Sequence, residues 1–397
     1  MLKNTPRWLP NALAGLVLLA FAAGCLYRVH RIVRAPERAE RLVANDSQHY
    51  LKIARSFSAG DVSMSYVKER AHRQPLYPLL LTPAMATAPD NLFLLAAVNV
   101  VLGTLVLGAA YLITAALFGR RWLALVVTIV LAANQFLIDH STERLLTEDL
   151  HLLLMLAVIY CFVRYLREQR TRWLVLTVLA AGLDYLTRPN GLFVAASALA
   201  VLGFTDLRAI VRSAPVLRRK EVRTLAARYG LALAVLIGVT TPSWLPRAVH
   251  IGNPLHHGYL NNYLWVDTYA EAHRAENFVR YTWRDYAASH NAGDAAKRWA
   301  HGIKRVVVEI PPGLEGLPVL YSLALAGCLV ALVFGPAPFR WLLLFFILQL
   351  LPLIWTNLPN PSPRVPYGAM LPFEVIFAGL FLALVVERWR RNGKGER

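Results

Sequence analysis

The sequence has 397 residues, of which 56% are hydrophobic and only 17% are charged, and the apolar residues fall in long blocks. A soluble core needs fewer apolar residues, so the composition predicts a polytopic membrane protein. A formal charge of +18 would suit nucleic-acid binding, but the basic residues lie between the apolar blocks and not on one face, which excludes that class.

The first block, "MLKNTPRWLPNALAGLVLLAFAAGC", has a basic start, an apolar run and small residues before Cys25, as a secretion signal does. Ala22 stands where a lipoprotein signal usually has Leu, and many apolar blocks follow. We therefore expect a retained signal anchor. Cys25, Cys161 and Cys328 lie far apart without metal or redox spacing, so we expect buried structural thiols.

The apolar blocks predict an all-α protein with about ten transmembrane helices. These are expected at residues 8–27, 92–118, 122–139, 145–163, 173–187, 191–205, 229–245, 317–334, 340–357 and 365–386. Residues 75–88, "PLYPLLLTPAMATA", are too short and too rich in proline to cross, so a re-entrant or interfacial piece is expected.

Two neighbouring blocks, 173–187 and 191–205, would each reach only about 22 Å as helices, against a hydrocarbon core of about 30 Å. The sequence "TRPNG" between them breaks a helix, so the pair could also be one broken span. The segments that flank the pair are both rich in Arg and should lie on the same side of the membrane. Two crossings place them there.

The spans divide the chain into five parts. They are a first helix at 1–27, an outer loop with interfacial helices and the catalytic acid at 28–90, helices two to seven at 91–245, a second outer loop at 246–316, and helices eight to ten with a basic tail at 317–397. Lys and Arg prevail in the short connections of one side, which predicts both termini in the cytoplasm. The small size and the short cytoplasmic tail suggest an inner (plasma) membrane protein.

Ionisable residues approach the apolar blocks only near the predicted outer ends. The spans contribute Arg144, Glu148, Asp184, Arg188 and Glu374, and the outer loops add Asp46, His49, Arg73, Arg247, His250, His256 and Arg364. Such residues near a bilayer usually face a partner or a wet cavity. Because the middle of every predicted span lacks charges, an ion pathway is not expected, and the pattern predicts a polar cavity at the outer face.

Several of these residues also have a purely structural interpretation. Asp46 is placed to cap a short helix that ends at Gly60. Arg144 and Glu148 have the i, i+4 spacing of a helix-surface pair, and Arg188 could reach the lipid headgroups. His256 has no acid or cysteine at a metal-ligand interval, so no metal site is predicted.

Seven short motifs occur in a characteristic order. They are "NDSQHYLKIA", "HRQPLYPLLL", "LFGRRW", "STERLLTEDLHLLLMLAVIY", "LDYLTRPNGLFV", "PSWLPRAVHIGNPL" and "PSPRVPYGAMLPF". In this order the chain resembles the GT-C superfamily of membrane glycosyltransferases, within it the branch of protein O-mannosyltransferases and the lipid A aminoarabinose transferase. The resemblance extends over about residues 1–390. Soluble nucleotide-binding and hydrolase signatures are not found in the sequence.

The resemblance implies a polyprenyl-phosphate sugar donor and inverting transfer on the non-cytoplasmic face. It places Asp46 at the catalytic centre, where it would act as the base. It assigns the donor phosphate to Arg73, Arg188 and Arg364, with Gln74 standing where a second proline is common. Supporting or acceptor residues are expected to be His49, Tyr77, Arg144, Glu148, Asp184, Arg247 and His256.

No divalent metal is expected, because the first loop lacks an Asp-x-Asp or Asp-Glu pair. The expected partners are the lipid-linked donor, membrane lipids and a glycan, lipid or protein acceptor. The short tail "VERWRRNGKGER" favours a lipid-linked or envelope glycan, since relatives with a soluble domain there use it on their acceptor. The Tyr- and Trp-rich loop 246–316 suits sugar contact and membrane docking equally.

Two other functions remain open from the sequence. One is a lipid or polysaccharide transporter without covalent chemistry, and the other is an O-antigen polymerase or ligase. Asp46, with "RQPLYP" close behind it, distinguishes the chain from polymerases and ligases, which usually lack an acid in the first loop.

Overall fold

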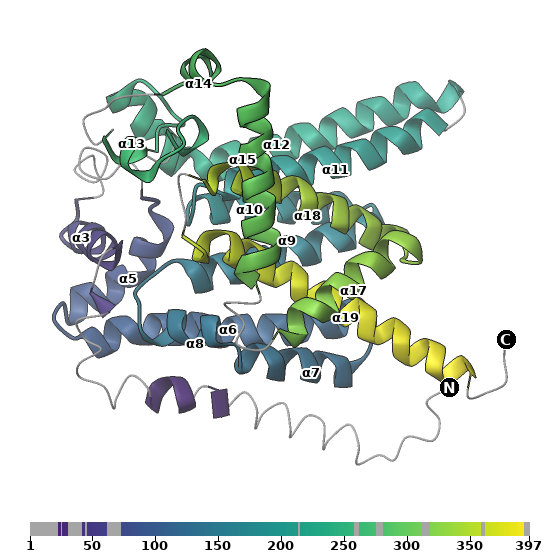
Figure 1. Ribbon diagram of the computed structural model, residues 1–397, viewed down its shortest axis with the longest axis horizontal. Coiled ribbons are helices and arrows are strands. Elements are labelled where there is room, and N and C mark those ends of the chain that lie inside the picture. The colour runs from purple at the N-terminus through teal and green to yellow at the C-terminus, as the bar shows by residue number, and fades with distance from the viewer. Residues whose placement is uncertain are drawn as a thin grey trace.

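The computed structural model describes residues 23–24, 26–30, 42–43, 46–61, 73–212, 215–257, 262–274, 281–311, 318–358 and 362–392. Within these ranges all regular elements are helices (Figure 1), which confirms the all-α prediction. The predicted first span, 8–27, lies largely outside them.

The helices follow the predicted order. They are α3 (Asp46–Ser58), α5 (Leu76–Thr87), α6 (Leu92–Phe118), α7 (Arg121–Ala132), α8 (Gln135–Thr142), α9 (Glu148–Glu168), α10 (Thr171–Tyr185), α11 (Gly191–Arg212), α12 (Pro215–Ile251), α13 (Tyr269–Arg274), α14 (Trp283–Ser289), α15 (Ala292–Ile303), a π-helical turn at Lys304–Glu309, α17 (Val319–Val333), α18 (Ala337–Thr356) and α19 (Arg364–Asn392).

Every predicted span after the first coincides with helical structure. In the described part of the chain, six helices (α6, α9, α11, α12, α18 and α19) are long and apolar enough to cross a membrane, and the α7–α8 pair, bent by 60°, makes a seventh if it is one span. Helices α10 and α17 have 15 residues each, about 22 Å. Helix length therefore supports six or seven crossings within these ranges and does not establish the predicted ten.

Several helices run past their predicted ends, and two of them, α11 and α12, do so at a buried polar residue. The α11 block was expected to stop before Asp206, but this carboxylate is buried and accepts hydrogen bonds from the hydroxyls of Tyr165 (2.5 Å) and Tyr229 (3.0 Å). Helix α12 continues through Pro242 and Pro246, so Arg247 lies in a helix and not in the predicted loop. In both helices a charged residue, Asp206 or Arg247, follows the predicted end of the span, and tertiary hydrogen bonds satisfy its side chain.

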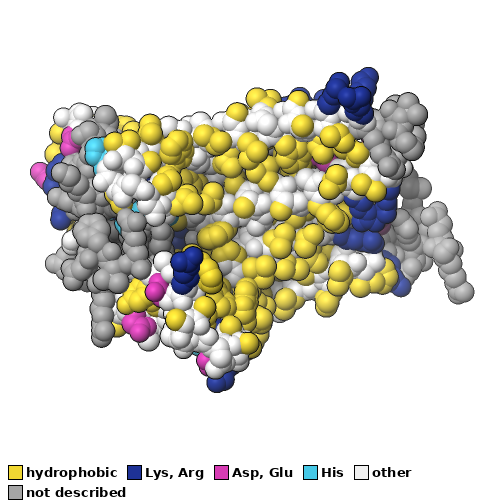
Figure 2. Space-filling view, turned by 90° about the horizontal axis from the view of Figure 1, so that it is seen from above, with side chains coloured by type: hydrophobic (Ala, Val, Ile, Leu, Met, Phe, Trp, Pro, Cys, Tyr) yellow, Lys and Arg dark blue, Asp and Glu magenta, His cyan; other side chains and the backbone are white. Residues whose placement is uncertain are grey.

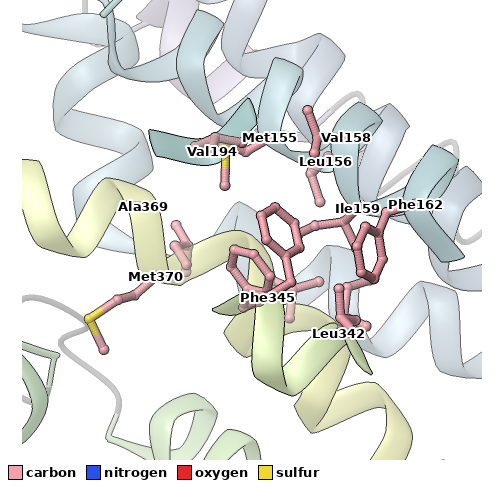
Figure 3. Packing of buried hydrophobic residues seen from close by; sticks show 14 of the residues in the cluster. Met155, Leu156, Val158, Ile159, Phe162, Val194, Leu342, Phe345, Ala369 and Met370 are labelled. Carbon is pink, nitrogen blue, oxygen red and sulfur yellow. The ribbon is translucent and has the colours of Figure 1, made fainter. Parts of the chain in front are cut away.

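The spanning helices pack around one apolar core. Figure 3 shows Phe162 of α9 beside Leu342 and Phe345 of α18, and the rings of Phe162 and Phe345 stack at 4.9 Å. Helices α17 and α19 approach closely at Gly327, where a Cβ atom would lie 1.9 Å from the carbonyl oxygen of Phe377. The core thus depends on a small residue at this crossing.

Substitution Gly327→Ala is expected to destabilise the fold, because the added methyl group can be accommodated only by moving backbone. Overpacking of this kind typically costs about 1–3 kcal/mol. The measurement is thermal unfolding in detergent, with Gly238→Ala on α12 as control, since nothing lies within 4 Å of a Cβ there. Equal unfolding temperatures for the two variants would contradict the close packing.

The molecule has two polar ends. Figure 2 shows a broad hydrophobic area between an end rich in Lys and Arg and an end that carries acidic and histidine side chains. At the basic end, Arg120 donates to the carbonyl of Ala383 (3.0 Å) and Arg167 donates to that of Leu117 (3.1 Å), which joins connections far apart in sequence. Helices α3, α5 and α13 lie at the other end (Figure 1).

The long loop between α12 and α17 has, in its described residues, its own small core against α18. Arg298 donates to Asp267 (2.9 Å) and to the carbonyl of Tyr263 (2.6 Å), and its guanidinium lies 4.5 Å from the centre of the Trp355 ring. Some of the loop's aromatic residues thus stabilise the loop itself, in addition to the predicted roles of sugar contact and membrane docking. Trp283 remains 59% exposed.

Candidate active site

Helix α3 positions Asp46. Tyr50, Ile53 and Ala54 form a buried apolar stripe on α3, and Tyr50 packs edge-to-face on Tyr77 of α5 at 5.2 Å. Gly60 ends the helix in the left-handed conformation, with φ +82°. Because one face of α3 is fixed against α5, Asp46 in its first turn has a defined place.

Asp46 forms ion pairs with two arginines from distant segments. Its Oδ1 accepts from Nη2 of Arg73, just before α5, and its Oδ2 accepts from Nη2 of Arg364, which begins α19. The Asp46 side chain remains 25% exposed. Helix capping alone does not account for a carboxylate whose two oxygens both contact guanidinium groups.

Glu148, the first residue of α9, extends this group. Its Oε1 lies 3.4 Å from Nη1 of Arg188 and 3.5 Å from Nε of Arg364, and its side chain is only 2% exposed. We call Asp46, Arg73, Glu148, Arg188 and Arg364 the arginine cluster. It has three cations and two carboxylates, so one positive charge is in excess, and a further anion would be attracted there.

The pKa of Asp46 reflects these neighbours. Partial burial alone would raise the pKa of this carboxyl, but the positive charges of Arg73 and Arg364, together with the hydrogen bond from Arg364, outweigh burial. The pKa of Asp46 therefore lies below its usual value, and the carboxylate is ionised at neutral pH.

Backbone contacts hold Arg188 in place. Its amide donates to the carbonyl of Asp184 (2.7 Å) at the end of α10, and the amide of Leu76 in α5 donates to the carbonyl of Leu186 (2.9 Å). The predicted residue Asp184 lies beside the cluster and not in its ion pairs. Its carboxylate accepts from Nδ1 of His151 on α9 at 2.6 Å.

The structure also places the remaining predicted residues. Arg247 is buried and donates to the carbonyl of Arg73 (3.3 Å), so it supports the cluster from behind. Tyr77 is buried and donates to Asn99 (2.6 Å), whose amide in turn donates to the carbonyl of Arg144 (2.7 Å). These contacts give Tyr77 a structural role.

Three further predicted residues lie outside the arginine cluster. Arg144 lies in the link between α8 and α9 with an exposed side chain, so the i, i+4 helix-surface pair with Glu148 is wrong. His49 is half-buried on α3, and His256 is buried just after α12.

Three polar residues that were not predicted, Ser243, His257 and Tyr185, lie around Gln74 behind Arg73. Gln74 is buried, its Oε1 accepts from the Ser243 hydroxyl (2.6 Å), and its Nε2 lies 3.4 Å from Nδ1 of His257. Nε2 of His257 lies 3.3 Å from the hydroxyl of Tyr185. Gln74, which stands where the related motif commonly has proline, thus has polar partners from distant parts of the chain.

Comparisons with known proteins agree with this architecture. The profile of the family described as dolichyl-phosphate-mannose-protein mannosyltransferase matches residues 72–240. A comparison with curated proteins finds no significant match. Among solved structures, the Archaeoglobus fulgidus oligosaccharyltransferase in complex with zinc and sulfate is similar with a TM-score of 0.56 and 16% identity, covering 93% of this chain and 49% of that one.

ArnT from Cupriavidus metallidurans is similar in two states. Bound to undecaprenyl phosphate it gives a TM-score of 0.57 at 14% identity, covering 93% of this chain and 60% of that chain. In the apo state it gives 0.52 at 16% identity, covering 97% and 63%. The chain therefore spans less than two thirds of the length of these proteins. The chain has the fold of the GT-C membrane glycosyltransferases, which confirms the predicted resemblance at the level of fold.

Proposed function

We propose that the protein is an inverting glycosyltransferase that moves a sugar from a polyprenyl-phosphate donor to an acceptor on the outer face of the membrane. The observation that carries this proposal is the contact of Asp46 with Arg73 and Arg364, three residues from separate segments at one polar end of the bundle. A base next to anion-binding cations is what displacement of a phosphate by an acceptor requires.

In this proposal the arginine cluster binds the donor phosphate, and Asp46 takes the proton of the attacking hydroxyl or amine. Arg suits the phosphate because its planar fork donates two hydrogen bonds and stays charged. When the phosphate attracts Arg73 and Arg364, Asp46 loses part of the positive field that lowers its pKa. A higher pKa makes a carboxylate a better base, so donor binding would activate Asp46.

The proposed reaction needs no divalent metal. The two guanidinium groups on Asp46 repel a cation, and among the described residues no group of three or more His, Cys, Asp or Glu side chains is placed to hold one. We expect transfer to continue in EDTA at the rate measured with added Mg²⁺ or Mn²⁺. Loss of transfer in EDTA that these metals restore would overturn this part of the proposal.

The family profile and the undecaprenyl phosphate bound to ArnT support the class of donor. We place the arginine cluster at the periplasmic side of an inner membrane, with both termini in the cytoplasm, because Lys and Arg gather at the opposite end (Figure 2). A lipid-linked or envelope glycan is the proposed acceptor.

The test uses purified protein in lipid with radiolabelled polyprenyl-phosphate hexoses and pentoses and a cell-envelope extract. We expect label to move to the extract and free polyprenyl phosphate to appear in equal amount. Movement of intact donor across the bilayer without its cleavage would favour a transporter, and consumption of diphosphate-linked donors only would favour a polymerase or ligase.

A further inference from the structure

A second layer of polar residues lies next to the arginine cluster, toward the middle of the bundle. His151 follows Glu148 by three residues on α9, and Gly368 follows Arg364 by four on α19. This spacing places each second residue one helical turn further along the same face. Asp184, four residues before Arg188, completes the layer from α10.

His151 and Asp184 form a tight buried pair. Their side chains are 1% and 0% exposed, and Nδ1 of His151 lies 2.6 Å from Oδ1 of Asp184. Because an ionised carboxylate only accepts, Nδ1 carries a hydrogen, which leaves Nε2 to act on a second group. Nε2 of His151 is buried and has no hydrogen-bond partner among the described residues.

The side of the His151 ring that carries Cδ2 and Nε2 lies near Arg188 of the cluster. A Cβ atom at Gly368 would lie 3.8 Å from Cδ2 of His151, which is bonded to Nε2, and 3.9 Å from Nη1 of Arg188. The imidazole edge and the guanidinium therefore converge on the same stretch of α19. Glycine is unfavourable inside a helix, and here a Cβ atom would be in ordinary contact with both side chains and with Cζ of Phe136 at 3.9 Å.

The chemistry of the layer fits an anionic leaving group. Buried polar groups are normally paired, so the unpaired Nε2 of His151, on the side of the ring that lies near Arg188, marks a place where a ligand atom would be satisfied. Arg188 attracts an anion, and the contact with Asp184 fixes the orientation of the imidazole ring. Protonated His151 would be a donor aimed at that anion.

We propose that His151, held by Asp184, is the proton donor to the leaving phosphate of the lipid-linked sugar. The acceptor oxygen or nitrogen forms the bond to the anomeric carbon, and its proton goes to Asp46. The bond between that carbon and the phosphate oxygen breaks, its electron pair stays on the oxygen, and Nε2–H of His151 supplies the proton. The products are the glycosylated acceptor and the polyprenyl phosphate monoanion. This inference rests on the proposed function.

The experiment compares wild type with His151→Gln in single-turnover transfer from two donors. One donor is the natural polyprenyl-phosphate sugar, and the other carries fluorine atoms on the lipid carbon next to the phosphate, which make the leaving phosphate more acidic. We expect His151→Gln to lower the rate with the natural donor by about 100-fold or more. With the acidic donor we expect a much smaller loss, because a good leaving group needs less protonation.

The matched control is His290→Gln, which changes a second His–Asp pair of similar length (His290 Nε2 to Asp267 Oδ2, 2.7 Å) in the outer loop. We expect it to transfer at the wild-type rate from both donors. If His151→Gln loses the same factor with both donors, His151 is only structural, and if it loses nothing, the inference is wrong. If wild type transfers from neither donor, the proposed function itself fails.

Gly368→Ala tests the same layer without removing a polar group. The added methyl group would be in ordinary van der Waals contact, so the variant should fold. We expect a raised KM for the donor and an unchanged unfolding temperature, since the methyl narrows the space between His151 and Arg188. A wild-type KM would show that the phosphate does not enter this space, which contradicts the proposal.

Discussion

Substitution Asp46→Asn is expected to lower the rate of sugar transfer by about 10²- to 10⁴-fold, the usual contribution of a general base. The amide cannot take a proton from the acceptor. Because Arg73 and Arg364 lose their carboxylate partner, their charge is fully available to phosphate, and the donor should bind at least as tightly as in wild type. The measurement combines donor binding and transfer with a radiolabelled polyprenyl-phosphate sugar.

The control for this variant is Asp61→Asn. Asp61 lies just after the other end of α3 and accepts from the Ser56 hydroxyl at 3.1 Å, so the same chemical change is made beyond the opposite end of this helix. We expect normal transfer. Equal transfer by Asp46→Asn and wild type would mean that Asp46 has only a structural role and that another acid is the base.

The lowered pKa of Asp46 also sets the sign of its pH dependence. A carboxyl whose folded-state pKa is depressed contributes stability that is present above its unfolded-state pKa of about 3.9 and is lost as pH falls through the folded-state value. The difference in unfolding temperature between wild type and Asp46→Asn should therefore be constant from pH 8 to pH 5. A difference that disappears in this range would show that the arginines do not depress the pKa.

Substitution Glu148→Gln is expected to affect both stability and transfer. Glu148 lies 3.4 Å from Arg188 and 3.5 Å from Arg364 and is nearly fully buried, so its loss leaves like charges without a shared partner. Removing one member of a buried ion pair typically costs about 3–5 kcal/mol. We expect a clearly lower unfolding temperature and no measurable transfer.

A double variant tests whether the lost stability comes from the unbalanced charge at the Glu148–Arg188 pair. Glu148→Gln with Arg188→Gln removes one charge of each sign, so we expect part of the lost stability to return while transfer remains absent. Glu387→Gln provides the surface control, because its contact with Arg120 is long (3.8 Å) and the Glu387 side chain is 45% exposed, and it should change stability by less than about 0.5 kcal/mol. If Glu148→Gln were as stable as wild type, the buried network would not hold the helices together.

Several features of the protein could be predicted from local sequence. The long apolar blocks specify helices because a membrane span must satisfy its own backbone, and α6 has the predicted bounds, 92–118. The stripe on α3 and its end at Gly60 follow from helix periodicity and from glycine's access to positive φ. The order of short motifs predicted the class of fold, which structural similarity confirms.

Other features depended on contacts between distant segments. Asp46 and Arg364 are 318 positions apart, and no local pattern shows that they meet. His151 stands within an apolar block and looks like a core residue, and Asp184 was placed in the site while its partner is this histidine. The bounds of α11 and α12 were missed because buried hydrogen bonds satisfied the polar groups that mark a helix end in sequence.

The sequence by itself determined which segments are helices and where along them the charged residues lie, because hydrophobic burial and backbone pairing act locally. Only the tertiary structure decided which charges become partners, because Coulomb attraction between buried groups depends on distance in space and not in sequence. Packing of α3, α5, α9 and α19 brings Asp46, Arg73, Glu148 and Arg364 to one place, and this packing turns scattered ionisable residues into a candidate active site.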